Sequence, residues 1–206
     1  SVGALSAAAL SALTSTQVAG LTATAISGLT ATQTAALSTT QLDYLKTTQL
    51  AALSSTGVEG LSATQIASLE NTQIAALTVT GLEGLTSTQA AALSTSQISA
   101  LTTSQVAALT STSISGFSAE QIAALSDTQF RSLSATAVAG LTAAQVAALT
   151  TTQVSLLTTT EVGGLTSTQV AALSTAQFAA LSTSQIGAIS TTALTGLNET
   201  NIDALT

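Results

Sequence analysis

The sequence has no cysteine, histidine, proline or tryptophan, and charged residues make up only 5% of its 206 residues. Without cysteine, the fold cannot depend on disulfides. Without histidine and cysteine, the usual general base, thiol nucleophile and soft metal ligands are missing, so we expect no enzyme activity, no cofactor and no metal site. No proline-rich or glycine-rich linker divides the chain.

Charge is scarce and mostly negative. Two basic residues, Lys46 and Arg131, stand against nine acidic ones, which gives a formal net charge of -7. Two cations cannot form a basic patch along a phosphate backbone, so we expect neither nucleic acid nor anionic membrane surfaces as partners. No apolar run approaches the roughly 18–20 residues that span a bilayer, so we expect no membrane insertion.

What the sequence does contain is one eight-residue unit, which repeats 25 times without insertion or deletion over residues 6–205. Its consensus is Ser/Thr-x-Thr-Gln-Val/Ile-Ala-Ala-Leu, as in residues 166–173. Units this short can contact only their neighbours, so we predict that residues 1–206 form a single uninterrupted solenoid. Because methionine is absent and both ends fall inside an octad, we expect a segment of a longer array.

The first and fourth positions of the octad are typical of a helix N-terminus. Position 1 is Ser or Thr everywhere except at Lys46, Glu70 and Asn198, and position 4 is Gln in 16 octads. A Ser or Thr N-cap accepts a hydrogen bond from the N–H three residues later, where Gln reaches back to the N–H of the N-cap and completes a capping box. Glu161 also fits this motif at position 4. The apolar residues at positions 8 and 5 then form a hydrophobic staple.

Each octad therefore predicts one short helix followed by a corner, because an N-cap residue has a non-helical backbone and recurs every eight residues. We expect an all-α repeat solenoid with positions 5 and 8 facing its axis. One continuous helix is excluded, because eight residues at about 100° each would carry Leu around the helix surface. The alternative is a β-solenoid, which the many Thr, Val and Ile residues would permit, although strict two-residue alternation is missing.

Seven octads lack Gln at position 4 and have Gly at position 7; we call them the Gly octads. Their successive spacings are three or four octads and average 28 residues, so we predict superhelical coils of about 3.5 octads with the glycines in one longitudinal packing stripe. The stripe would either contact another solenoid or an outside segment, or mark tight corners that need a positive φ. The stripe consists of Gly28, Gly60, Gly84, Gly116, Gly140, Gly164 and Gly196.

The remaining residues offer little chemistry. Among the acidic residues only Glu59 and Glu83 lie at position 6 of Gly octads, and they could lie one coil apart on one face. We expect separate solvated charges there, with a weak cation-attracting pair as the alternative, and no small-molecule substrate. We expect the aromatic residues to fill the core rather than to form a binding site; they are Tyr44, Phe117, Phe130 and Phe178.

The run of Leu-Ser/Thr-x-x-Gln-Val/Ile-x-x-Leu units, as at residues 101–109, resembles arrays in very large, repetitive bacterial secreted or cell-surface proteins described as adhesin-like or RTX-like. The resemblance covers the whole chain. It departs from true RTX arrays, because the Gly- and Asp-rich calcium-binding nonapeptide is absent. It implies an extracellular or cell-surface location and a structural role.

We therefore expect a structural protein, a rod or filament-forming segment that associates with itself end to end or laterally. An ice-binding module is one alternative, because Thr occupies position 3 in 18 octads. The objection is that these residues would lie on all sides of the coil, whereas an ice-binding face should be one-sided. A passive adhesin stalk is the third possibility.

Overall fold

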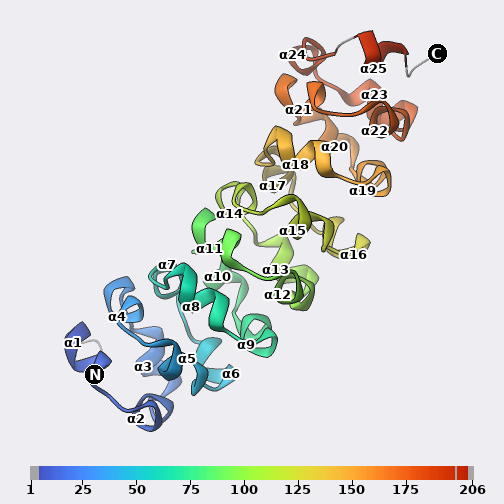
Figure 1. Ribbon diagram of the computed structural model, residues 1–206. Coiled ribbons are helices and arrows are strands. Elements are labelled where there is room, and N and C mark those ends of the chain that lie inside the picture. The colour runs from blue at the N-terminus through green and yellow to red at the C-terminus, as the bar shows by residue number, and fades with distance from the viewer. Residues whose placement is uncertain (1–4, 198, 204–206) are drawn as a thin grey trace.

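The structure is a computed structural model that describes residues 5–197 and 199–203. Short helices follow one another around an axis, and the chain advances from one end of an elongated array to the other, with the helices of residues 7–11 and 199–203 at opposite ends (Figure 1). The prediction of an all-α repeat solenoid is confirmed. The β-solenoid alternative is wrong, because no strand occurs in the described residues.

Each octad forms one helix of four to six residues, and two to four residues connect successive helices. The helices are α1 (Ala7–Ser11), α2 (Ser15–Ala19), α3 (Ala23–Ser27), α4 (Ala31–Ala35), α5 (Thr39–Asp43), α6 (Thr47–Leu50), α7 (Ser55–Glu59), α8 (Ala63–Ser68), α9 (Asn71–Ala76), α10 (Val79–Leu82), α11 (Ser87–Ala92), α12 (Thr95–Ala100), α13 (Thr103–Ala107), α14 (Ser111–Ser115), α15 (Ala119–Ala123), α16 (Asp127–Phe130), α17 (Ala135–Ala139), α18 (Ala143–Ala148), α19 (Thr151–Leu156), α20 (Thr159–Gly163), α21 (Ser167–Ala171), α22 (Thr175–Ala179), α23 (Thr183–Ala188), α24 (Thr191–Leu194) and α25 (Glu199–Asp203).

The predicted capping box is confirmed, and α13 shows its geometry. Thr102 has an extended backbone, with φ -72° and ψ 160°, and its hydroxyl accepts a hydrogen bond of 3.2 Å from the Gln105 N–H. The Gln105 carbonyl oxygen Oε1 accepts a bond of 2.8 Å from the Thr102 N–H. At Lys46 and Glu70, which have no hydroxyl, the N-cap side chain makes no such bond, but the Gln three residues later still reaches back.

The predicted core positions are also correct. Every position 5 side chain from Leu10 to Phe178 is buried, and so is every position 8 side chain from Leu29 to Ile189. Each large apolar side chain contributes about 1.5–3 kcal/mol when fully buried. Three of the aromatic residues lie in this core, but Tyr44 is 54% exposed, so its expected place in the core is wrong. It is at position 7, directly after the last residue of α5.

Position 4 Gln has a second role, which joins neighbouring coils. The amide nitrogen Nε2 of Gln105 donates to the carbonyl oxygens of Leu77, Ala75 and Ile74, at 2.7, 3.0 and 3.3 Å. These carbonyls belong to the C-terminal end of α9, where a helix leaves its last C=O groups without partners. One Gln side chain therefore caps the start of its own helix and the end of a helix in the preceding coil.

The same bonds recur along the array, and we call them the Gln ladder. They begin with Gln33 donating to the Leu5 carbonyl and continue to Gln185 donating to the Leu157 carbonyl, and Asn201 makes the equivalent bond to Leu173. These three bonds each join residues 28 apart in the chain, and other bonds of the ladder reach 30 or 31 residues back. This separation confirms the predicted coil of about 3.5 octads.

Half-integral coils produce a staggered stacking of helices. Because a coil holds about 3.5 octads, α13 does not lie directly above one helix: it packs against α10, while its Gln105 reaches the end of α9. Each helix thus lies across the junction between two helices of the preceding coil. The backbone needs no left-handed residue to do this, because no described residue has a positive φ.

We predict that Gln105→Ala lowers the free energy of unfolding by about 2–4 kcal/mol, because it leaves buried carbonyls of α9 without a donor and also removes half of a capping box. Thr102→Ala is the matched control, since it removes only the cap of the same helix and should cost about 1 kcal/mol. Urea unfolding measures both values, and amide exchange in α9 should rise only for Gln105→Ala. Equal losses in the two variants would show that the ladder adds nothing to the cap.

Candidate functional site

The predicted packing stripe lies where successive coils approach most closely. At Gly60, Gly84, Gly116, Gly140 and Gly196, the backbone crosses the residue 29 positions earlier, which is position 2 of an octad in the preceding coil. A Cβ atom added at Gly84 would lie 2.6 Å from the carbonyl carbon of Ser55, and one added at Gly140 would lie 2.6 Å from the Cα of Ser111. These five glycines are required because any side chain would collide with the main chain beneath it.

The other two glycines of the stripe are different. A Cβ atom at Gly28 or Gly164 would meet only carbonyl oxygens of its own helix, at 3.5–3.8 Å, which is ordinary contact. Gly28 lies in the first described coil. Gly164 lies in the octad of Glu161, the one Gly octad whose position 4 carries a long side chain.

The tight-corner interpretation of the stripe is wrong, because all described glycines have negative φ. The other interpretation is that the stripe contacts another solenoid or an outside segment, but most of the stripe is already covered. At five of the seven glycines the space beside the Cα is filled by the preceding coil of the same chain. What the stripe provides is close backbone contact within the array.

A small residue at position 4 accompanies each close crossing. At Gly81, an added Cβ would lie 3.2 Å from the Leu53 carbonyl oxygen, 28 residues earlier. This is the equivalent of the carbonyl that Gln reaches with its side chain in other octads. Coils therefore cross in two ways. Where position 4 is Gln and position 7 is mostly Ala, a Gln amide bridges the two coils. Where position 4 is small and position 7 is Gly, the two backbones can touch directly.

Sequence reasoning missed the second bond of Gln, although a signal for it exists. A capping box accepts Glu as well as Gln. Gln nevertheless occupies position 4 in 16 octads and Glu in one. Because only the amide can donate a hydrogen bond, this preference indicates that the NH₂ group has an acceptor.

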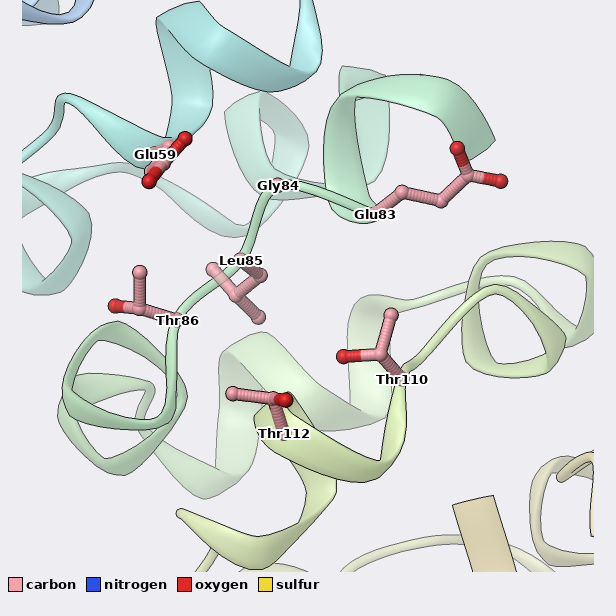
Figure 2. A pocket seen from close by; sticks show the side chains of 7 residues that line it. All are labelled: Glu59, Glu83, Gly84, Leu85, Thr86, Thr110 and Thr112. Carbon is pink, nitrogen blue, oxygen red and sulfur yellow. The ribbon is translucent and has the colours of Figure 1, made fainter. Parts of the chain in front are cut away.

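An open groove of about 320 Å³ lies beside Gly84 (Figure 2). Its walls carry hydroxyl groups of three threonines, and its lining residues are Glu59, Glu83, Gly84, Leu85, Thr86, Thr110 and Thr112. The Glu59 and Glu83 carboxylates lie on different sides of Gly84 and point apart, so the structure does not bring this pair together around one point (Figure 2). A second groove of about 260 Å³ is lined by Thr39, Thr40, Asp43 and Ser68.

Neither groove gathers a set of groups for catalysis. Within residues 5–197 and 199–203, no three His, Cys, Asp or Glu side chains come together as metal ligands. Among the groups of the described residues, the one clear pKa shift is that of Glu120, which is exposed. Hydrogen bonds from its own backbone N–H and from the Ser118 hydroxyl, the latter 2.8 Å long, favour the charged carboxylate and lower its pKa.

None of the helices in the described part of the chain has the length and apolar character that a membrane span requires.

We predict that Gly84→Ala lowers the free energy of unfolding by about 1–3 kcal/mol, because the new methyl group must push two coils apart. Gly164→Ala is the matched control at the same octad position. It should be neutral or stabilise by up to about 1 kcal/mol, since its φ of -85° suits alanine and no other coil is near. Thermal or urea unfolding of both variants tests this. A neutral Gly84→Ala would contradict the close crossing.

Comparison with known proteins agrees with the repeat structure. The family model described as the ALTTAQ repeat matches residues 34–71, 45–79, 66–103, 80–111 and 157–191, which together make up more than half of the chain. Residues 172–177, Ala-Leu-Ser-Thr-Ala-Gln, differ at one position from the six residues in that description. None of the curated proteins compared with the chain matches it. The chain belongs to the ALTTAQ repeat family.

Proposed function

We propose that the chain is a structural protein, a stiff rod-like segment of an extracellular or cell-surface protein that assembles into filaments. The observation that carries this proposal is the Gln ladder, whose bonds recur in the Gln octads from Leu5 at one end of the described chain to Asn201 at the other. Because side chains of the repeat join each coil to the preceding one, the array is suited to be a straight rod of fixed length. The proposed role includes no catalytic step.

Stiffness is supported by the lack of places to bend. Helices are separated by only two to four residues, and one continuous core runs along the axis. Stability in such arrays is the sum of unit and nearest-neighbour terms. Local opening is easiest in segments with few buried apolar contacts, such as long loops. The described residues contain no long loop.

End-to-end association is supported by unsatisfied contacts at the two ends of the described array. Gln17 is exposed, whereas every other position 4 Gln is buried. Its Oε1 caps α2, so its amide nitrogen is in place to donate to a further coil. At the other end, Leu194 is 42% exposed and Ile202 is 51% exposed. A coil of a second copy stacked there would cover these side chains and extend the ladder.

The location rests on resemblance to large repetitive bacterial proteins of the cell surface, and the same resemblance leaves a passive adhesin stalk as an alternative. Ice binding is less well supported. Position 3 side chains are exposed in every octad from residue 8 to residue 192, and successive octads face different sides of the coil. No single face therefore collects the threonines.

Electron microscopy of the purified 206-residue chain at rising concentration tests the proposal. We expect elongated particles of uniform width that join into filaments. Gln17→Glu is the matched variant: a carboxylate keeps the capping box, as Glu161 does with Thr158, but cannot donate to a further coil. We expect rods that stay short in this variant.

Each other outcome has a definite meaning. Compact particles would contradict the structural role. Single rods at all concentrations would contradict filament assembly and favour the stalk. Filaments that form equally well from Gln17→Glu would place the contact elsewhere. Thermal hysteresis at millimolar protein would favour ice binding instead.

A further inference from the structure

The N-terminal end of the described array offers a hydrogen-bond donor. The Oε1 atom of Gln17 accepts bonds from the Thr14 N–H and hydroxyl, at 2.8 and 3.1 Å, whereas its Nε2 atom donates to no described residue. In the Gln ladder this nitrogen donates to a carbonyl 28 residues earlier, as from Gln105 to Leu77, and for Gln17 that position lies before residue 1. The amide of Gln17 is therefore held by its capping box with its donor side open.

The C-terminal end offers acceptors. The last bond of the ladder joins Asn201 to the Leu173 carbonyl. The position 8 carbonyls that follow would need donors 28 residues later, beyond the described residues. They are those of Leu181, Ile189 and Leu197. Since they lie at the C-terminal ends of short helices, they are carbonyls of the kind that a helix cannot satisfy by itself.

Apolar surface is exposed at both ends. Along the array, position 5 and position 8 side chains are buried, because adjacent coils cover them. At the N-terminal end, Leu13 and Leu21 at position 8 are only partly buried. At the C-terminal end, Leu194 and Ile202 at position 5 are 42% and 51% exposed. Each end thus exposes side chains that a further coil covers elsewhere in the array.

The first coil also has the small residues of a close crossing, but no coil is pressed against them. Ala25 is half-buried and Gly28 is exposed. In the last coil, the equivalent Ala193 is buried, and Gly196 lies directly on the backbone of Ser167. The N-terminal end therefore has room for the backbone of a further coil.

We propose that these two ends bind each other, so that the N-terminal coil of one copy receives the C-terminal coil of a second copy. The chain then assembles head to tail, and every copy in a filament points in the same direction. Gln17 donates to a position 8 carbonyl in the last coil of the second copy, as Gln105 donates to Leu77 within the chain. This inference rests on the proposed filament assembly and adds which two surfaces meet.

Like ends do not match each other. Two N-terminal ends would bring together the Gln17 donors without the carbonyls that they need, and two C-terminal ends would bring carbonyl oxygens together. Buried polar groups without partners are unfavourable. A contact between two different surfaces that does not close into a ring continues without limit. The helices α2 and α24 lie near opposite ends of an elongated array, so each added copy extends the same line (Figure 1).

Two variants each block one end. Gln17→Glu removes the donor at the N-terminal end, and Leu194→Glu places a charge on the apolar surface at the C-terminal end. Both residues are exposed in the single chain, so both variants should fold, and circular dichroism checks this. Thr16→Glu and Thr192→Glu are the matched controls, because they add the same charge to the same helices at position 3, which stays exposed where coils stack.

Light scattering after size-exclusion chromatography measures the mass of each sample of the 206-residue chain. We expect the wild type and both controls to assemble, and each blocked variant alone to have the mass of one copy. An equimolar mixture of Gln17→Glu and Leu194→Glu should contain particles of twice that mass and no larger ones. In the mixture, one intact N-terminal end meets one intact C-terminal end, and both remaining ends are blocked.

Several results would overturn head-to-tail binding while leaving the proposed filament intact. Leu194→Glu that dimerises alone would show that two N-terminal ends bind each other, and Gln17→Glu that dimerises alone would show the same for two C-terminal ends. Filaments from either blocked variant, or a mixture that keeps the mass of one copy, would place the contact elsewhere. A wild type that stays single at every concentration would overturn this inference and the proposed assembly together.

Discussion

The structure depends on one side chain that satisfies two helix ends at once. A helix of five residues is too short to be stable alone, because most of its N–H and C=O groups lie in the first and last turns and have no partner within it. The Gln at position 4 supplies an acceptor to the N-cap N–H of its own helix and a donor to the last carbonyls of a helix 28 residues earlier. Where position 4 is Gln, the last carbonyls of a helix are therefore met by the next coil, so these short helices are stable only as parts of the stack.

The core follows from the same geometry. The capping box places position 5 one turn into the helix and position 8 at the corner, so both face the axis. Val106 and Leu109 are buried in this way, whereas the position 2 and 3 residues before them, Thr103 and Ser104, are exposed and can vary. Polar residues at the corner do not disturb the core, because the hydroxyl of Thr102 is used by the backbone of its own helix.

Much of this architecture could be predicted from the sequence, because capping is a local matter. Thr102, Gln105 and Val106 lie within five residues of each other, and their types are enough to indicate where a helix begins. The coil size was also accessible, through the spacing of the Gly octads. The hydrogen bonds of the Gln105 amide nitrogen could not be predicted, because their acceptors, the Leu77 and Ile74 carbonyls, become neighbours of Gln105 only when the coil closes.

The glycine stripe could be recognised in the sequence, but the reason for it could not be predicted. Gly84 is needed because of the Ser55 main chain, and nothing local to Gly84 indicates that contact.

The staggered stacking has a consequence for how such arrays change in length. Each kind of contact between coils joins fixed positions of the octad: a position 4 Gln meets position 8, and at the close crossings a position 7 Gly meets position 2. A duplication or loss of one whole octad therefore leaves both kinds of contact available and only rotates the coils that follow it. We therefore expect that genes for such arrays can lengthen or shorten by twenty-four nucleotides at a time while the product keeps its core positions. A shift by any other number of codons would break every contact across the junction, which explains why 25 octads follow one another without a single inserted or deleted residue.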